Sequence, residues 1–357
     1  MKTAIRLVER GLVPKPLIRR AIRRLLRERQ SELRDLYGAD RSAGLASWVE
    51  AMRAGPVAPV PDKANEQHYE VPAGFFDLAL GSRLKYSSAY YPDEHATLDE
   101  AEEAMLALTA ERAQLADGQR ILELGCGWGS LSLWMAERFP AARIVSVSNS
   151  GPQRERITGE ACRRGLTNLE VVTCDMNAFD AADHGAPFDR IVSVEMFEHM
   201  RNWEELLGRA SRWLAADGRV FLHVFAHTRW PYPFEVRDES DWMSKYFFTG
   251  GMMPCHDLLD HLTTPFEVEQ RWEVNGSHYA RTSEDWVRNL ERRRAEVLPV
   301  LAATYGAENA GVWFQRWRIF FLACAELFAF DAGKEWIVSH QLLRPRATAG
   351  ASGSDAR

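Results

Sequence analysis

Cysteine is scarce in this chain of 357 residues, and its five cysteines are widely scattered. None forms a Cys-x-x-Cys pair or a close cluster with histidine, so neither a disulfide framework nor a structural zinc site is expected. No apolar run is long enough to span a bilayer, and the N-terminus has no apolar stretch typical of a secretory signal. We therefore expect a cytoplasmic protein without a metal.

An excess of positive charge is also missing. The chain has 44 Lys and Arg against 50 Asp and Glu, for a formal net charge of -6. This excludes nucleic-acid binding through the charge of the whole surface, and we expect no nucleic-acid partner. The hydrophobic share of 46% is that of an ordinary globular protein, and the twelve tryptophans are its one unusual feature.

The first segment of the chain is basic and amphipathic. Arginine and leucine recur at helical spacing up to Arg34, with a break between two helices at Gly11 to Pro16. Two interpretations fit: a helical cap with solvated charges, or a helix on a membrane surface or in a transit segment. Acidic residues lie among the basic ones and favour the interpretation as a cap. Contact with a membrane is expected only if the protein modifies lipids. The Pro-rich stretch 53–61 is predicted to be a linker.

Short apolar segments alternate with amphipathic helices after Gly118. This alternation predicts an α/β fold with a doubly wound, mostly parallel sheet. The predicted strands cover residues 120–124, 143–147, 169–173, 188–194 and 218–224. The predicted domains are an N-terminal helical cap and linker (1–94), a Rossmann-like core (95–230), substrate-cap helices with final strands (231–346) and a disordered tail (347–357).

A glycine-rich turn follows the first predicted strand. Residues Glu123 to Gly129 read E-x-G-x-G-x-G, which is neither the G-x-G-x-x-G dinucleotide motif nor a phosphate-binding loop with G-K-[ST]. The pattern resembles the first motif of Rossmann-like, class I S-adenosylmethionine-dependent methyltransferases. That resemblance implies S-adenosylmethionine as cofactor, with the acid and the glycines at its amino-acid end and a crevice beyond the strand ends.

Further cofactor contacts are expected where the next strands end. Asp175 is placed to accept from the adenine amino group and Met176 to pack on the ring, although an Asp after a strand is also a common turn residue. The predicted cofactor-binding residues are Tyr86, Ser87, Glu123, Gly125, Gly127, Trp128, Gly129, Ser148, Asn149, Gln153, Asp175 and Met176.

Two acids and a histidine follow the fourth predicted strand. One helical turn would bring Glu195 and His199 to a common face, while Glu198 would point about a hundred degrees away. The alternatives are a core histidine and an acid that offsets a helix dipole. We predict that all three are catalytic residues.

Longer motifs make the resemblance specific. The chain is similar to the cyclopropane-fatty-acyl-phospholipid synthase superfamily through His68-Tyr69, residues 86–91, 196–199, 245–251 and 278–286. Within it, the chain is more similar to the coclaurine N-methyltransferase group. That choice rests on residues 11–14, 90–91, 97–102, 194–195, 317–320 and 325–328. The similarity covers all but the C-terminal tail.

Departures from the superfamily pattern separate its branches. Cyclopropane synthases are expected to have Cys at Ser88, near a bound bicarbonate, and Gly at Glu195. The remaining bicarbonate-site positions, Glu198, His223 and Tyr279, are present, so a remnant of that site can survive. Losing the Cys and gaining an acid favours a base that acts on the acceptor itself. A lipid-modifying enzyme, methylating or cyclopropanating unsaturated acyl chains of phospholipids, is the alternative.

The resemblance implies an N-methyltransferase for a small amine, such as an arylalkylamine or a tetrahydroisoquinoline-like compound. Such amines are almost fully protonated at pH 7, so the acceptor requires a base. We expect His199, near its unperturbed pKa, to take the proton, with Glu195 orienting it or holding the ammonium. The predicted substrate-pocket residues are Tyr90, His223, Tyr279 and Phe328. The identity of the amine and the oligomeric state, a homodimer included, are left open.

Overall fold

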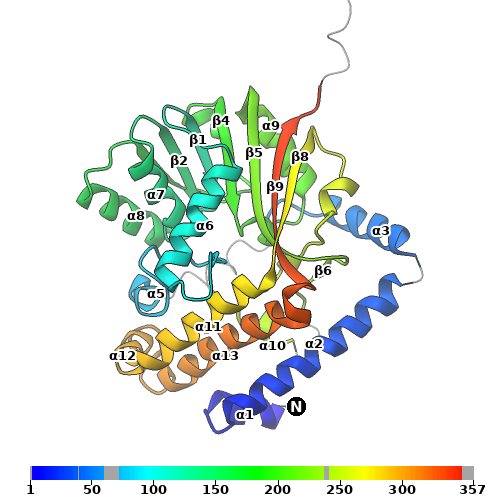
Figure 1. Ribbon diagram of the computed structural model, residues 1–357, viewed down its shortest axis with the longest axis vertical. Coiled ribbons are helices and arrows are strands. Elements are labelled where there is room, and N and C mark those ends of the chain that lie inside the picture. The colour runs from blue at the N-terminus through cyan, green and yellow to red at the C-terminus, as the bar shows by residue number, and fades with distance from the viewer. Residues whose placement is uncertain (1, 39, 60–71, 237–240, 348–357) are drawn as a thin grey trace, which may run out of the picture.

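The computed structural model describes residues 2–38, 40–59, 72–236 and 241–347. A seven-stranded sheet forms its centre, with the strand order β3-β2-β1-β4-β5-β9-β8 (Figure 1). The strands β1 to β5 run parallel, and β9 lies antiparallel between β5 and β8. The prediction of a doubly wound, mostly parallel α/β sheet is therefore confirmed. The strands are β1 (Arg120–Leu124), β2 (Arg143–Ser148), β3 (Leu169–Thr173), β4 (Phe188–Val194), β5 (Leu214–His227), β8 (Phe266–Val274) and β9 (Trp336–Pro345).

The predicted strands agree with the observed ones, except that β5 is longer than residues 218–224. It begins earlier because Leu214 pairs with Phe188 of β4, and it ends later because β9 pairs along it as far as His227 opposite Trp336. A second, two-stranded sheet joins β6 (Tyr232–Pro233) to β7 (Met252–Met253).

Helices cover both faces of the main sheet. On one face, α6 (Leu98–Arg112) and α7 (Ser130–Arg138) share a hydrophobic cluster with β1, β2 and β4, and α8 (Gly151–Arg163) packs beside β3. On the other face, α9 (Trp203–Trp213) and α3 (Arg41–Arg53) share a second cluster. Short 3-10 turns are η2 (Ala181–His184), η3 (Phe197–His199), η4 (Leu258–His261) and η5 (Phe330–Gly333).

Helices from both ends of the chain pack together below the sheet in Figure 1. A large aromatic cluster joins them to the core. They are α1 (Lys2–Glu9), α2 (Lys15–Tyr37), α5 (Ala73–Ala79), α10 (Trp242–Tyr246), α11 (Gly276–Arg292), α12 (Arg294–Tyr305) and α13 (Ala310–Phe328).

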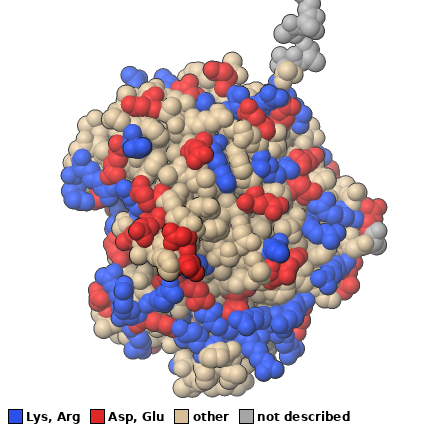
Figure 2. Space-filling view, viewed as in Figure 1, with Lys and Arg blue, Asp and Glu red and all other residues tan. Residues whose placement is uncertain are grey.

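The basic helix α2 packs against α13. Its buried face includes Ile18 and Leu33, and Arg19 and Arg23 both form ion pairs with Glu326 of α13. Several of its basic side chains therefore have partners within the protein, as a cap requires. Lys and Arg also gather at the lower end of the face shown in Figure 2. Among the described residues, no helix is both long and apolar enough to cross a membrane.

The predicted linker is attached to the core over its described residues. The carbonyl of Val57 accepts from the Arg201 amide at 2.7 Å, and the backbone of Ala58 exchanges two hydrogen bonds with the side chain of Asn177. Its last two residues lie outside the described part of the chain, as do His68, Tyr69 and residues 348–357 of the predicted tail. The predicted domain boundaries stay a prediction.

Candidate active site

A cavity opens at the carboxyl ends of β1, β2, β3 and β4, which is where parallel sheets of this type bind ligands. Its wall includes every residue predicted to bind the cofactor except Gly129. Residues from the loop before α6 complete the wall, together with Ala58 of the docked linker and Thr249 and Gly251 of the cap segment.

The glycine-rich turn shapes this cavity for a ligand. Gly125 and Gly127 have φ of +83° and +52°, a conformation that favours glycine. A Cβ on Gly127 would meet no atom within 4 Å, so the backbone there faces open space. Three cavity residues also carry buried polar atoms without a hydrogen-bond partner among the described residues: Trp128 Nε1, Ser130 Oγ and Gln153 Nε2. Such atoms suit a polar molecule bound in the cavity.

Gly129 differs from the other predicted cofactor residues because it lies where two helices pack closely. It begins α7 with φ of +86°, and an added Cβ would lie 2.6 Å from Cγ1 of Ile157 in α8. The glycine is needed because α7 and α8 pack closely at this point, and it does not line the cavity. Its contact with the cofactor stays a prediction.

The acids along the strand ends are held by neighbouring polar groups. Glu123 accepts from the hydroxyls of Ser132 and Ser146, and burial raises its pKa to about 7. Asp175 accepts from the backbone and side-chain amide of Asn177 at 2.9 and 3.4 Å. Asp175 thus has the turn role weighed above and also lines the cavity. Both acids offer acceptors for hydroxyl or amino groups of a ligand.

Glu195 lies in a strained conformation at the end of β4. Its φ is +48°, a region that side-chain-bearing residues rarely adopt and that costs roughly 1–3 kcal/mol. The expected superfamily residue at this position, glycine, is the one that adopts this conformation without strain. The strained backbone of Glu195 therefore holds its carboxylate in an almost fully buried position at the cavity wall.

Three donors from three distant segments converge on that carboxylate. The Ser88 amide donates to Oε1 at 2.9 Å, the Tyr279 hydroxyl donates to Oε2 at 2.6 Å, and His223 Nε2 lies 3.2 Å from Oε1. These are three of the positions that the resemblance assigns to a bicarbonate site. Burial raises the pKa of Glu195, and Lys85, Ser88 and Tyr279 oppose that rise.

Glu195 and His199 both line the cavity, but no helical turn joins them. The backbone of Glu195 has a positive φ and is not in a right-handed helical conformation, and the 3-10 turn η3 begins only at Phe197. The predicted helical spacing is therefore wrong. The His199 ring stacks on Phe248 with centroids 5.8 Å apart. Burial lowers its pKa to about 4, against the attraction of Glu195, so the expectation of an unperturbed pKa is also wrong.

Glu198 lies behind the cavity wall. It is fully buried, and its Oε1 accepts from the Phe225 amide at 2.7 Å. Its Oε2 has no hydrogen-bond partner among the described residues. Burial and the nearby charge of Glu195 raise the pKa of Glu198 well above its usual range. Its catalytic role stays a prediction.

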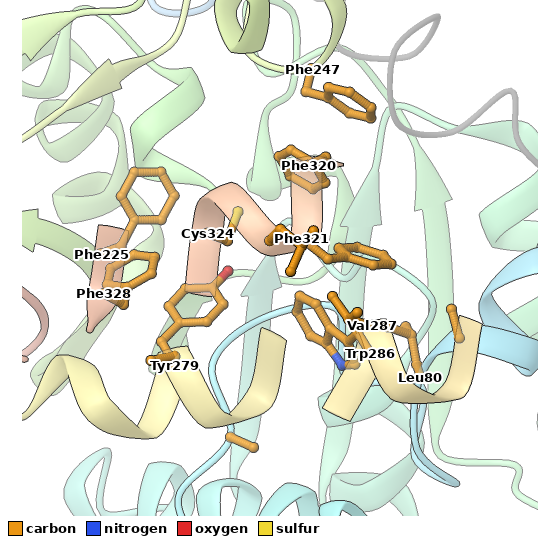
Figure 3. Packing of buried hydrophobic residues seen from close by; sticks show 14 of the residues in the cluster. Leu80, Phe225, Phe247, Tyr279, Trp286, Val287, Phe320, Phe321, Cys324 and Phe328 are labelled. Carbon is orange, nitrogen blue, oxygen red and sulfur yellow. The ribbon is translucent and has the colours of Figure 1, made fainter. Parts of the chain in front are cut away.

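None of the four residues predicted to form the substrate pocket lines this cavity. His223 and Tyr279 reach the site by contacting Glu195. Phe328 stacks on Tyr279 with ring centroids 4.2 Å apart, and Figure 3 shows Phe225 beside this pair. Tyr90 stacks on His278 at 4.5 Å. Their contact with a substrate stays a prediction.

Sequence reasoning missed two buried bases, Lys85 near Glu195 and His340 behind His223. The Lys85 ammonium donates to Ser87 Oγ at 2.5 Å and to the Ser88 carbonyl at 2.8 Å, and it lines the cavity. Burial lowers its pKa to about 8. His340 of β9 contacts His223 at 2.9 Å. Nothing in the sequence near either residue indicates its burial. Within the described ranges, no cluster of His, Cys, Asp and Glu could hold a metal ion.

Comparison with known proteins decides the family. A family model described as mycolic acid cyclopropane synthetase matches residues 60–336. The chain belongs to this family. Its fold and cofactor cavity are those of an S-adenosylmethionine-dependent methyltransferase, which confirms the predicted class of enzyme and cofactor.

Within the mycolic acid cyclopropane synthetase family, the chain is similar to (S)-coclaurine N-methyltransferase of Thalictrum flavum subsp. glaucum. The two are 36% identical over 344 residues, which cover 95% of this chain and 94% of the relative. A crystal structure of coclaurine N-methyltransferase bound to N-methylheliamine and SAH has a TM-score of 0.91 and 35% identity, covering 96% and 99% of the two chains. Cyclopropane-fatty-acyl-phospholipid synthase of Escherichia coli strain K12 is 29% identical over 266 residues, covering 74% of this chain and 63% of that one.

Proposed function

We propose that the protein transfers a methyl group from S-adenosylmethionine to the nitrogen of a small amine, an arylalkylamine or a tetrahydroisoquinoline-like compound. The similarity to coclaurine N-methyltransferase along nearly the full length of both chains supports this activity. The observation that carries the proposal is the Glu195 carboxylate, which is held by three donors at the cavity wall beside the neutral ring of His199.

When bound, S-adenosylmethionine supplies an electrophilic methyl group on a positively charged sulfur. The buried anion of Glu195 attracts the ammonium form of the substrate and places its nitrogen at the cavity wall. Ser88, His223 and Tyr279 fix the carboxylate, so little reorganisation is needed when the substrate binds. The bound ammonium must lose a proton before its nitrogen has a lone pair that could accept the methyl group.

His199 is the group that takes the proton from the amine. Because burial lowers its pKa to about 4, the ring is neutral at neutral pH and has a lone pair to offer. Loss of water also lowers the pKa of a bound ammonium. The pKa of the ammonium and the pKa of His199 then differ by less than they would if the ammonium stayed in water. Once protonated, the ring is stabilised by the nearby Glu195 carboxylate, whose attraction favours the charged form.

Mass spectrometry of the reaction products tests this proposal. The purified full chain is incubated with S-adenosylmethionine and, in parallel, with primary to tertiary arylalkylamines or vesicles of unsaturated phospholipid. We expect a gain of one methyl on an amine and no change in the lipid. A methylene or methyl gain on the acyl chains, with no amine product, would instead establish the lipid-modifying alternative and overturn the proposal.

The role of the histidine needs a matched substitution. His199→Ala is expected to lower kcat/KM by ~100-fold or more while cofactor affinity stays within about twofold. His184→Ala removes a histidine that pairs with Glu170 and does not line the cavity, and it should leave both values unchanged. Equal losses of turnover and cofactor affinity in His199→Ala would contradict its role as the base.

A further inference from the structure

A chain of hydrogen-bonded side chains runs from Arg112, the last residue of α6, through two histidines to Glu195. Arg112 Nη1 lies 2.9 Å from His340 Nδ1, and His340 Nε2 lies 2.9 Å from His223 Nδ1. His223 Nε2 in turn lies 3.2 Å from Glu195 Oε1. Both histidines are fully buried, on the adjacent strands β5 and β9, where they are paired in register.

The two ends of this chain fix its direction. A guanidinium can only donate hydrogen bonds, so Nδ1 of His340 must accept. A neutral imidazole has one donor and one acceptor, so His340 donates from Nε2 and Nδ1 of His223 accepts. His223 must then donate from Nε2 to the carboxylate, which accepts. Each ring is neutral under this scheme, in keeping with burial, which lowers the pKa of both histidines well below the usual range.

We propose that Arg112 and His340 are positioning residues that act through His223 to hold the Glu195 carboxylate ionised and in one orientation for the amine. This inference rests on the proposed function. These hydrogen-bonded side chains cannot carry the substrate proton away, because the guanidinium of Arg112 at the far end cannot accept a proton. The proton must therefore leave on the cavity side of Glu195, where His199 lies. Arg112 is half-buried and also lies over the ring of Trp272.

The tautomers of the two rings test the chain without any substrate. Full-length protein labelled with ¹⁵N-histidine is measured by NMR at neutral pH, and His340→Gln and His223→Gln assign the two sets of signals. We expect both rings neutral with the proton on Nε2. A proton on Nδ1 of either ring, or a charged ring, would overturn the direction of the chain. This result is independent of whether the protein methylates amines.

Two substitutions at one position test the role. His340→Gln can still accept from Arg112 with its carbonyl and donate to His223 with its amide, whereas His340→Leu breaks the chain. We expect kcat/KM with the amine to fall ~10-fold or more in His340→Leu and to stay within about threefold in His340→Gln. Cofactor affinity should stay within about twofold in both. Equal kinetics in His340→Leu and the wild type, or equal losses in both variants, would overturn the proposal.

The pH profile separates positioning from a merely structural role. Without the donor chain the pKa of Glu195 should rise, so the acid limb of kcat/KM should move to higher pH by about one unit in His340→Leu. An unmoved limb would contradict the role. The ionisable groups that face Glu195 are Lys85, Glu198, His199, His223, Tyr279 and Cys324.

A control and a second variant keep the test decisive. His256→Leu removes another histidine that contacts β9, through Ser339, but has no link to Glu195, and it should behave as wild type. Arg112→Met removes the donor at the half-buried end, in case His340→Leu does not fold. It should lower kcat/KM by about threefold or more and mix the tautomers of His340. Unchanged tautomers would overturn the proposal, whereas wild-type protein inactive on amines would overturn the proposed function alone.

Discussion

The hydroxyl of Tyr279 in α11 donates a 2.6 Å hydrogen bond to Oε2 of Glu195 at the end of β4. This bond joins the helical cap to the core sheet at Glu195, which lines the cavity. The Tyr279 ring is held in place by Phe328, which stacks on it, so the cap positions the carboxylate through a rigid aromatic pair (Figure 3).

Tyr279→Phe should therefore weaken the site without disturbing the packing. The ring and its stacking on Phe328 remain, but Glu195 loses one donor, and a buried acceptor left unpaired costs about 1–3 kcal/mol. We expect kcat/KM for the amine to fall ~10-fold or more in steady-state assays. Tyr91→Phe is the matched control, because Tyr91 donates to Asp285 and does not line the cavity. Similar losses in both variants would contradict the role of Tyr279.

Gly129 and Gly127 should respond in opposite ways to alanine. Gly129→Ala places a Cβ against Ile157, so we expect a lower melting temperature with cofactor affinity little changed. Gly127→Ala adds its Cβ in open space beside the cavity, so cofactor affinity should fall by more than stability does. Thermal unfolding and isothermal titration with S-adenosylhomocysteine measure both effects. Recovery of Gly129→Ala by Ile157→Ala would support the packing explanation, and a cofactor defect alone in Gly129→Ala would contradict it.

The docked linker should contribute to cofactor binding. Asn177 exchanges two hydrogen bonds with the backbone of Ala58, which lines the cavity, and it also contacts Asp175. Asn177→Ala should lower cofactor affinity by about 5–10-fold with little change in melting temperature. Asn168→Ala removes side-chain bonds to the backbone of α7 and of Phe139, away from the cavity, and serves as the control. Unchanged affinity in Asn177→Ala would show that the linker does not help to hold the cofactor.

A buried acid in α6 should make stability depend on pH. Burial raises the pKa of Glu102 to about 7 from its ordinary 4.5, against hydrogen bonds from the Gly81 and Arg83 amides. Because the folded protein holds the proton of Glu102 more tightly than the unfolded chain does, the folded state is most stable at low pH. This contribution to stability is lost as the pH rises from 4.5 through 7. Relative to Glu102→Gln, the wild type should lose about 3 kcal/mol of unfolding free energy between pH 4.5 and 8. Denaturant unfolding at both pH values measures this loss.

The control for that experiment is the neighbouring residue. Glu103 is about half exposed and pairs with Arg83, so Glu103→Gln should show no comparable pH-dependent difference. A constant difference between the wild type and Glu102→Gln across this pH range would contradict the raised pKa.

Local patterns in the sequence were enough to predict the five parallel strands and the glycine-rich turn, and the family resemblance added most of the residues that line the cavity. Strand periodicity and the glycine-rich turn lie within short windows, so they also indicated Glu123, Asp175 and Glu195. The positive φ of Glu195 was not predictable, because it depends on how β4 meets the loop that follows.

Contacts between distant segments were beyond the reach of such patterns. Arg112 and His340 are 228 positions apart and meet because β9 returns to pair beside β5. Lys85 hydrogen-bonds to its neighbour Ser87, but its buried place near Glu195 brings together segments far apart in the sequence. Gly129 fits the cofactor motif in spacing, but that motif gave no sign that Ile157 of α8 also packs closely against it.

A single-turnover assay of Glu195→Gln beside the wild type tests the central claim most directly. Each protein, loaded with S-adenosylmethionine, is mixed with the amine that the panel identifies, and methylated product is followed by rapid quench. The account predicts that the rate falls ~100-fold or more, with cofactor affinity within about threefold, while Glu170→Gln on the surface matches the wild type. A rate in Glu195→Gln equal to that of the wild type would contradict the claim that this buried carboxylate prepares the amine for methyl transfer.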